Sequence, residues 1–294
     1  MTVQQFGEVR PPADARSDLA LDSGVRVGGV DVRYSVSGEG SRDLVLVHGH
    51  GAHHLWWQGI APLLEPHWRV IQLELSGHGD SGHRPDYSAD VWSADVLAVL
   101  DAVGADRPVL VGHSMGGIVL LALAAAHPER AAGVVLLDAG VFPPHRYRPG
   151  TEEDIRLSRP GAPPHGEPTQ AGLLQRFRLM PPQPHPAPDV LEPVARFSTR
   201  ETTAGWTWKH DRVGVTRMSD ADIERRARLV RCPVALVHAT ESSVVDREVA
   251  EHTIEVTAGR LVPVPGAHHH LVLEQPDRCA ELIDELASGM HRGA

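Results

Sequence analysis

The chain has 294 residues, 41% of them hydrophobic and 22% charged, which excludes wholesale disorder and allows one large α/β domain with an inserted subdomain. Its 28 basic and 38 acidic residues give a formal net charge of -10. This balance argues against a nucleic acid or a membrane as partner, because both favour a basic face, and it suits a small-molecule substrate that is neutral or apolar.

The N-terminal segment, residues 1–22, is polar and aperiodic, and we expect a loosely held arm there. It contains no apolar stretch typical of a signal peptide, and no part of the sequence approaches the ~20 apolar residues of a membrane span. Cysteine is scarce, with only Cys232 and Cys279. These features predict a cytoplasmic protein.

The remaining pattern alternates between predicted strands and helices. Residues 25–36 alternate apolar and polar side chains, which predicts a hairpin. Short apolar runs then predict strands buried on both faces, at 44–49, 69–75, 108–114, 133–139 and 233–239. Helical stretches at 88–105 and 116–131 lie between them, so we expect a doubly wound, mostly parallel sheet.

The alternation is interrupted from residue 142 to residue 229, where proline is dense. A long irregular insert in a compact domain is usually a lid or a binding segment, although proline also stiffens ordinary surface loops. We therefore predict an α/β core at 23–141 and 230–294, carrying a mainly helical or irregular lid at 142–229.

The segment Gly112-His113-Ser114-Met115-Gly116 lies between a predicted strand and a predicted helix. This is the context of a G-x-S-x-G turn that presents a nucleophilic serine at the carboxyl end of a strand. A serine that only caps the helix is the alternative, because the pentapeptide is not specific by itself.

The runs LVLVHGHG, LSGHGDSGHRPDYS, VLVGHSMGG and VPGAHHHLVLEQP occur in this order, and with them the chain resembles the α/β-hydrolase superfamily. The resemblance covers residues 25–290 outside the insert. It implies Ser114 as nucleophile and the backbone N–H groups of His50 and Met115 as the oxyanion hole. It implies no metal and no cofactor.

The resemblance also implies a catalytic histidine before Leu273-Glu274-Gln275-Pro276, and alignment on these residues places it at His269. Three adjacent histidines, at 268–270, stand where the family usually has Gly-His. A register shift of one residue would select a neighbour of His269, and otherwise the spare histidines are expected in a surface loop.

The acid of a Ser-His-acid triad should orient the imidazole and lie between Ser114 and His269 in the chain. Ser242 occupies the position where many relatives carry an aspartate, and serine cannot hold the charge. Some relatives draw the acid from the preceding strand instead, which favours Asp138. Glu241 is the second candidate and Asp246 the third.

The predicted substrate-binding residues are aromatic or polar side chains near the turn and in the insert, although aromatic residues in a lid also serve only to hold it to the core. They are Trp56, Trp57, His113, Phe142, Trp206 and Trp208.

The sequence thus predicts a carboxylic ester hydrolase that cleaves an ester, thioester or lactone of a small to medium, largely apolar substrate through an acyl-serine. The alternatives are a cofactor-free perhydrolase or lyase, or a non-hydrolytic binding protein on the same fold. A metal-dependent hydrolase that uses His48, His50 and His53 is less favoured, because Ala52 stands where such a ligand run has an aspartate. The oligomeric state stays open.

Overall fold

The computed structural model describes residues 20–147, 166–184, 186–212 and 215–292. The predicted N-terminal arm, apart from residues 20–22, lies outside the described residues, as does the 148–165 part of the predicted lid. No helix in the described ranges combines the length and apolar character that a bilayer span requires.

The described residues form an eight-stranded sheet in the order β1-β2-β4-β3-β6-β7-β11-β12. Its strands are β1 (Ser23–Val27), β2 (Val30–Ser37), β3 (Asp43–Val47), β4 (Arg69–Leu73), β6 (Val109–His113), β7 (Gly133–Leu137), β11 (Val234–Ala239) and β12 (Arg260–Val264). β1 pairs antiparallel with β2 and β2 with β4, whereas all pairs from β4 to β12 are parallel. The predicted mostly parallel sheet and its N-terminal hairpin are confirmed.

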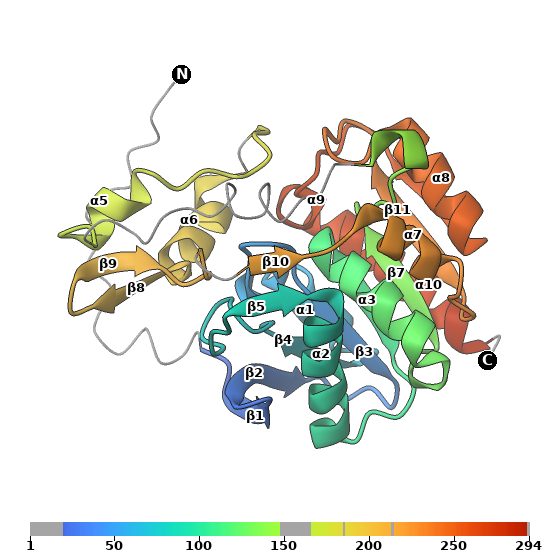
Figure 1. The fold of residues 1–294 in the computed structure, drawn as a ribbon, viewed down its shortest axis with the longest axis horizontal. Helices are drawn as coiled ribbons and strands as arrows, with labels where there is room; N and C mark the ends of the chain where they lie inside the picture. The colour runs from blue at the N-terminus through green and yellow to red at the C-terminus, as the bar shows by residue number, and fades with distance from the viewer. Residues whose placement is uncertain (1–19, 148–165, 185, 213–214, 293–294) are drawn as a thin grey trace.

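Helices cover both faces of the sheet, as Figure 1 shows. The longer ones are α2 (Ala89–Val103), α3 (Met115–Ala126), α7 (Asp220–Ala227), α8 (Arg247–Thr257) and α10 (Pro276–Arg292). The shorter elements are η2 (His54–Trp57), α1 (Ala61–Leu64), β5 (Asp86–Ser88), η3 (Pro128–Arg130), η4 (Pro144–Arg146) and α9 (Leu271–Glu274). One buried apolar cluster joins α2, α3, α7 and α8 to the sheet, and another joins α1, α9 and α10 to its opposite face.

Local chemistry explains the bounds of α2. The Ser88 hydroxyl accepts a hydrogen bond from the Val91 N–H at the first turn, and Gly104 ends the helix with a left-handed φ of 67°. The helix therefore begins and ends on side-chain signals that are readable in the sequence, within the predicted 88–105 range.

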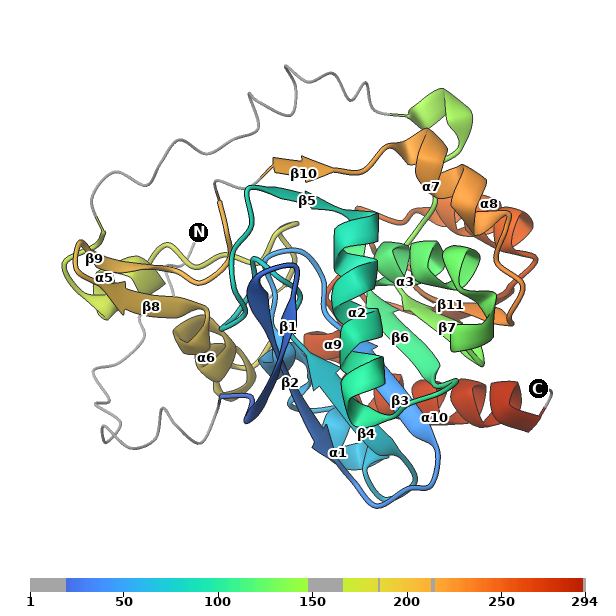
Figure 2. The ribbon, with the colours of Figure 1, turned by 60° about the horizontal axis from the view of Figure 1, so that its bottom comes forward.

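The described part of the 142–229 region contains more strand than we expected. Its further elements are α5 (Gln170–Leu174), α6 (Pro188–Phe197), β8 (Thr199–Thr202), β9 (Gly205–Trp208) and β10 (Val215–Arg217). β8 and β9 form an antiparallel hairpin, and β10 pairs parallel with β5. We call residues 166–212 the cap segment; Figure 2 shows α5, α6, β8 and β9 together beside the sheet. α7 instead packs on α3 and α8, and the domain boundaries stay a prediction.

The cap segment is tied to the core by polar contacts. Gln58 Nε2 donates to the Val190 carbonyl at 2.7 Å. Lys209 is the only lysine in the chain. Its Nζ lies 2.7 Å from Asp80 Oδ1 and 3.4 Å from the centre of the Phe197 ring. An ion pair combined with a cation–π contact fixes the C-terminal end of the hairpin against the core.

Candidate active site

Ser114 occupies a strained turn between β6 and α3. Its φ of 50° and ψ of -122° lie in a region that non-glycine residues avoid, at a cost of ~1–3 kcal/mol. Neither side of the serine has room for a side chain. A Cβ at Gly112 would lie 2.5 Å from the Gly117 nitrogen, and a Cβ at Gly116 would meet the Val47 carbonyl. The glycines of the motif therefore allow the close packing that presents Ser114.

Ser114, His269 and Asp138 form one hydrogen-bonded chain. His269 Nε2 lies 3.0 Å from Ser114 Oγ, and His269 Nδ1 lies 2.7 Å from Asp138 Oδ2. Asp138 follows β7 with a φ of 45°, and its side chain is fully buried. Because the carboxylate accepts the Nδ1 proton, Nε2 is left to accept the hydroxyl proton of Ser114.

Ser242 contacts the carboxylate that we favoured as the acid. Its hydroxyl donates to Asp138 Oδ2 at 2.5 Å and accepts from the N–H groups of Val244 and Val245, each at 3.1 Å. The second carboxylate oxygen, Oδ1, accepts from the Ala239 N–H at 3.1 Å. The position that lacks an acid in the sequence thus supplies a hydrogen-bond donor to Asp138.

The other carboxylates considered from the sequence lie elsewhere. Glu241 is exposed on the surface, although it is the residue next to Ser242. Asp246 caps α8 by accepting from the Val249 N–H and pairs with Arg146. Neither carboxylate has a hydrogen bond to His269 among the described residues.

The three adjacent histidines have different surroundings. His268 Nδ1 lies 2.9 Å from Glu274 Oε1. His270 is buried, 4% exposed, and its ring packs edge-on against Trp56 with 5.0 Å between the ring centres. A surface loop is therefore the wrong expectation for His270.

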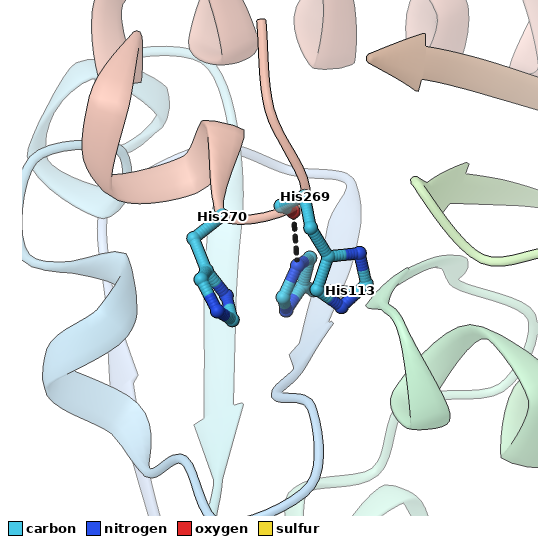
Figure 3. Close-up of side chains that lie close together, drawn as sticks. All are labelled: His113, His269 and His270. Carbon is cyan, nitrogen blue, oxygen red and sulfur yellow. Dashed lines mark hydrogen bonds between the residues drawn. The ribbon is translucent and has the colours of Figure 1, made fainter. Parts of the chain in front are cut away.

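His113 connects the turn that carries Ser114 with the loop that carries His269. Its Nε2 donates to the carbonyl of His269 at 2.8 Å, and Figure 3 shows its ring beside those of His269 and His270. Burial lowers the pKa of His113 well below its ordinary value, with the neighbouring histidines adding to the effect. The side chain before the nucleophile thus braces the loop that carries His269.

The loop at Gly49 and His50, which we call the predicted oxyanion loop, packs closely against Ser114. A Cβ at Gly49 would lie 2.9 Å from His113 Nδ1 and 3.3 Å from Ser114 Cβ. No hydrogen bond among the described residues takes up the N–H of His50 or of Met115. The His50 side chain is exposed, with its ring near those of His78 and His210.

The predicted aromatic residues are distributed over three places. Trp56 contacts His113 and His270, whereas Trp57 is fully buried in the apolar core. Phe142 packs on the cluster between the sheet and α3, and the Arg146 guanidinium lies over its ring. Trp206 and Trp208 lie on β9, where the Trp208 ring contacts Phe177 of the cap segment. The structure therefore brings Trp56 and His113 together, whereas Trp206 and Trp208 lie on the hairpin of the cap segment.

A second serine–histidine pair lies at the cap segment. His53 Nε2 lies 3.0 Å from Ser198 Oγ and 3.1 Å from the Val194 carbonyl. A carbonyl can only accept, so Nε2 carries a proton and cannot take one from Ser198. The Ser198 hydroxyl itself donates to the Val194 carbonyl at 2.8 Å. This pair closes the end of α6 and differs from the Ser114 arrangement.

Among the described residues, His48, His50 and His53 do not form a group of converging ligand atoms. His48 instead donates from Nδ1 to the Gly49 carbonyl and accepts the Leu75 N–H at Nε2.

Two other groups bring three possible ligand atoms within 4.8 Å of one another, namely His113, His269 and His270, and His53, His54 and Glu74. In the first, His269 has both nitrogens in hydrogen bonds. In the second, Glu74 accepts from His54 Nδ1 and from the Asp80 N–H. One member of each group, His269 in the first and Glu74 in the second, is therefore already engaged in hydrogen bonds within the protein.

The buried histidines predict a loss of stability in acid. Burial lowers the pKa of His48 to about 4 and that of His270 to about 3, and it also lowers the pKa values of His53, His78 and His113. These histidines therefore stay neutral in the folded protein. In the unfolded chain the same side chains take up protons as the pH falls below 6.5, their ordinary pKa. The stabilisation is complete above pH 6.5 and is lost as the pH falls toward 4.

We expect urea unfolding at pH 7, 6 and 5 to show a falling free energy of unfolding, by up to about 1.4 kcal/mol per pH unit for each such histidine. An unfolding free energy that stays constant across this range would contradict the burial of these rings as neutral groups.

Comparisons with known proteins agree with this geometry. Residues 44–282 match the Alpha/beta hydrolase family. A serine hydrolase-like protein of Danio rerio is 38% identical over 106 residues, which are 35% of this chain and 32% of that protein, so this chain spans about a third of it. A pimeloyl-(acyl-carrier protein) methyl ester esterase of Edwardsiella ictaluri is 24% identical over 273 residues, covering 86% of this chain and 95% of that enzyme.

A solved structure gives the same fold over nearly the whole chain. The thioesterase domain from the curacin biosynthetic pathway superposes with a TM-score of 0.74 and 21% sequence identity, covering 89% of this chain and 98% of that domain. At this identity the likeness supports the arrangement of strands and helices.

Proposed function

Because the chain belongs to the alpha/beta hydrolase family, as its motifs predicted, we propose that it is a carboxylic ester hydrolase that works through an acyl-serine. The observation that carries the proposal is the chain of hydrogen bonds from Ser114 Oγ through His269 to Asp138, on a strained turn at the end of β6. A nucleophile, a base and a group that orients the base are the minimum that this chemistry needs.

In the proposed acylation step, Ser114 Oγ attacks the carbonyl carbon of the substrate while His269 Nε2 takes the hydroxyl proton. Asp138 holds Nδ1 and stabilises the positive charge that forms on the ring. The N–H groups of His50 and Met115 stabilise the negative charge on the carbonyl oxygen, each donor being worth about 3–4 kcal/mol in the barrier. The carbon–oxygen or carbon–sulfur bond then breaks, and the His269 proton passes to the leaving alcohol or thiol.

In the deacylation step, water takes the place of the alcohol. His269 Nε2 accepts a proton from the water as its oxygen attacks the acyl carbon, and returns a proton to Ser114 Oγ as the acid leaves. Asp138 keeps Nδ1 protonated in both steps, so Nε2 always faces the reacting oxygen.

The relatives support an acyl substrate. The Edwardsiella enzyme is a methyl ester esterase and the curacin domain is a thioesterase. Both names describe release of an acyl group, from oxygen or from sulfur. For this chain we propose an ester, thioester or lactone of a small to medium, largely apolar molecule, with the cap segment as the lid over it.

We also propose that the protein acts in the cytoplasm on a small molecule, without a nucleic acid or a membrane as partner. Both cysteines, Cys232 and Cys279, are free and buried. Free thiols suit a reducing compartment.

Covalent labelling tests the proposed nucleophile. We expect a fluorophosphonate probe to modify Ser114, and p-nitrophenyl butyrate to give a burst of about one equivalent of nitrophenol when the second step is slower. Peptide mass spectrometry locates the modified residue. The Ser198→Ala variant is the matched control and should be labelled like the wild type, because Ser198 has no base. Labelling of Ser198 in place of Ser114 would overturn the proposal.

A further inference from the structure

Four side chains beside the reacting pair form what we call the polar cluster: Trp56, His113, Gln183 and His270. His113 directly precedes Ser114, and His270 directly follows His269. The His113 and His270 rings lie 5.8 Å apart, centre to centre, and the His270 N–H donates to Gln183 Oε1 at 2.8 Å. Figure 3 shows the two rings next to each other, both beneath the loop that carries His269. The cap segment thus reaches the loop that carries His269 through Gln183.

The polar cluster contains buried polar atoms without partners. Among the described residues, no hydrogen bond is made by Trp56 Nε1, His113 Nδ1 or Gln183 Nε2, whereas the His270 ring interacts with the carbonyls of Met180 and Pro181. Such an atom costs about 1–3 kcal/mol, and buried polar groups in proteins are nearly always paired. Their concentration beside Ser114 indicates that a bound molecule supplies the partners.

The hydrogen-bonding role of most of these atoms follows from the contacts already made. His113 Nε2 donates to a carbonyl, and since burial keeps this ring neutral, Nδ1 carries a lone pair and accepts. Gln183 Oε1 accepts from the His270 N–H, so Nε2 is its donor end. Trp56 Nε1 can only donate. The polar cluster therefore offers at least one acceptor and two donors.

The polar cluster carries no charge of its own at neutral pH. Burial lowers the pKa of His270 to about 3, although the carbonyls of Met180 and Pro181 oppose this fall. Placing a carboxylate among these atoms would bury an ion without a counter-charge, which is costly. An uncharged group that both donates and accepts matches them.

The position of His113 Nδ1, the acceptor of the polar cluster, determines where the bound uncharged group lies. A Cβ at Gly49 would be 2.9 Å from His113 Nδ1 and 3.3 Å from Ser114 Cβ, so this lone pair lies at the predicted oxyanion loop. A substrate that presents its carbonyl to Ser114 would bring its next few atoms to the polar cluster.

We propose that the polar cluster binds an uncharged amide group of the substrate next to the carbonyl that is attacked. The amide N–H donates to His113 Nδ1, and the amide oxygen accepts from Gln183 Nε2 and Trp56 Nε1. The preferred substrates are then esters or thioesters of N-acylated amino acids or similar amide-bearing acids. This inference rests on the proposed function of Ser114.

Two p-nitrophenyl esters of equal chain length test the preference: the ester of N-acetylglycine and that of pentanoic acid. Each kcat/KM is divided by the rate constant for alkaline hydrolysis of the same ester, which removes the difference in intrinsic reactivity. We expect a ratio of at least about tenfold in favour of the amide ester, because a site built for a hydrogen-bonding group discriminates against an analogue that lacks it. The anionic p-nitrophenyl hemisuccinate should be the poorest of the three.

The Gln183→Leu variant should lose most of that ratio, chiefly through slower turnover of the amide ester. The Gln58→Leu variant is the matched control, because it also removes a glutamine hydrogen bond between the core and the cap segment, and it should keep the ratio. A normalised ratio near one in the wild type, a preference for the hemisuccinate, or an equal loss in both variants would overturn the amide inference. These results leave the proposed function standing if Ser114 is still labelled; absent labelling and turnover would instead remove the proposed function.

Discussion

Replacement of Ser114 by alanine is expected to lower kcat for ester hydrolysis by about a millionfold, which brings turnover close to background. The variant removes the oxygen that forms the acyl intermediate and leaves His269 without a proton to accept. Ester hydrolysis followed at saturating p-nitrophenyl butyrate measures the effect.

The fold should survive this change. The turn at Ser114 has a φ of 50°, which strains alanine as it strains serine, so the free energy of unfolding should change little. Urea denaturation of both proteins provides the control. Ester turnover at the wild-type rate by folded Ser114→Ala would rule out the proposed nucleophile.

The Asp138→Asn variant should lower kcat about ten-thousandfold, equivalent to about 5 kcal/mol in the barrier. An amide in place of the carboxylate presents a donor or a neutral oxygen to His269 Nδ1, so the imidazole loses both its orientation and the charge that stabilises its protonated form. Asparagine tolerates the φ of 45° found at Asp138, which limits backbone disturbance.

Glu241→Gln is the matched comparison for the acid, because Glu241 is exposed and lies next to Ser242. It should keep nearly all activity. The two variants therefore distinguish the two candidate acids. If Glu241→Gln abolishes activity and Asp138→Asn retains most of it, the acid lies after β11 and the proposed role of Asp138 is wrong.

Most of the sheet could be predicted because its strands are encoded locally. Runs such as residues 44–49 and 108–114 are short and largely apolar with a glycine near their end, and they correspond to β3 and β6. The β8–β9 hairpin could not be predicted in the same way. Its strands read TRET, which has no apolar residue, and GWTW, whose alternation is too short to define a strand, and they are held by pairing with each other.

The site was predictable where a motif fixes the backbone and not where distant segments meet. Ser114 lies in a local turn, and the loop bearing His269 is marked by its following Leu-Glu-Gln-Pro. Gln183 lies in a proline-rich stretch without any pattern, and only folding brings it to His270. Three histidines in a row offered some signal, because a run of rings beside a catalytic position is unusual for a solvated loop.

The last strand of the sheet has a consequence for how copies of this chain meet. β12 has β11 as its only partner among the described residues, and it carries Pro263 with an exposed side chain. Proline has no N–H to offer to a further strand, and the exposed Arg260 adds a charge to the same edge. Growth of the sheet from one molecule into the next is therefore blocked at this end, so that concentrated protein is protected there against edge-to-edge aggregation.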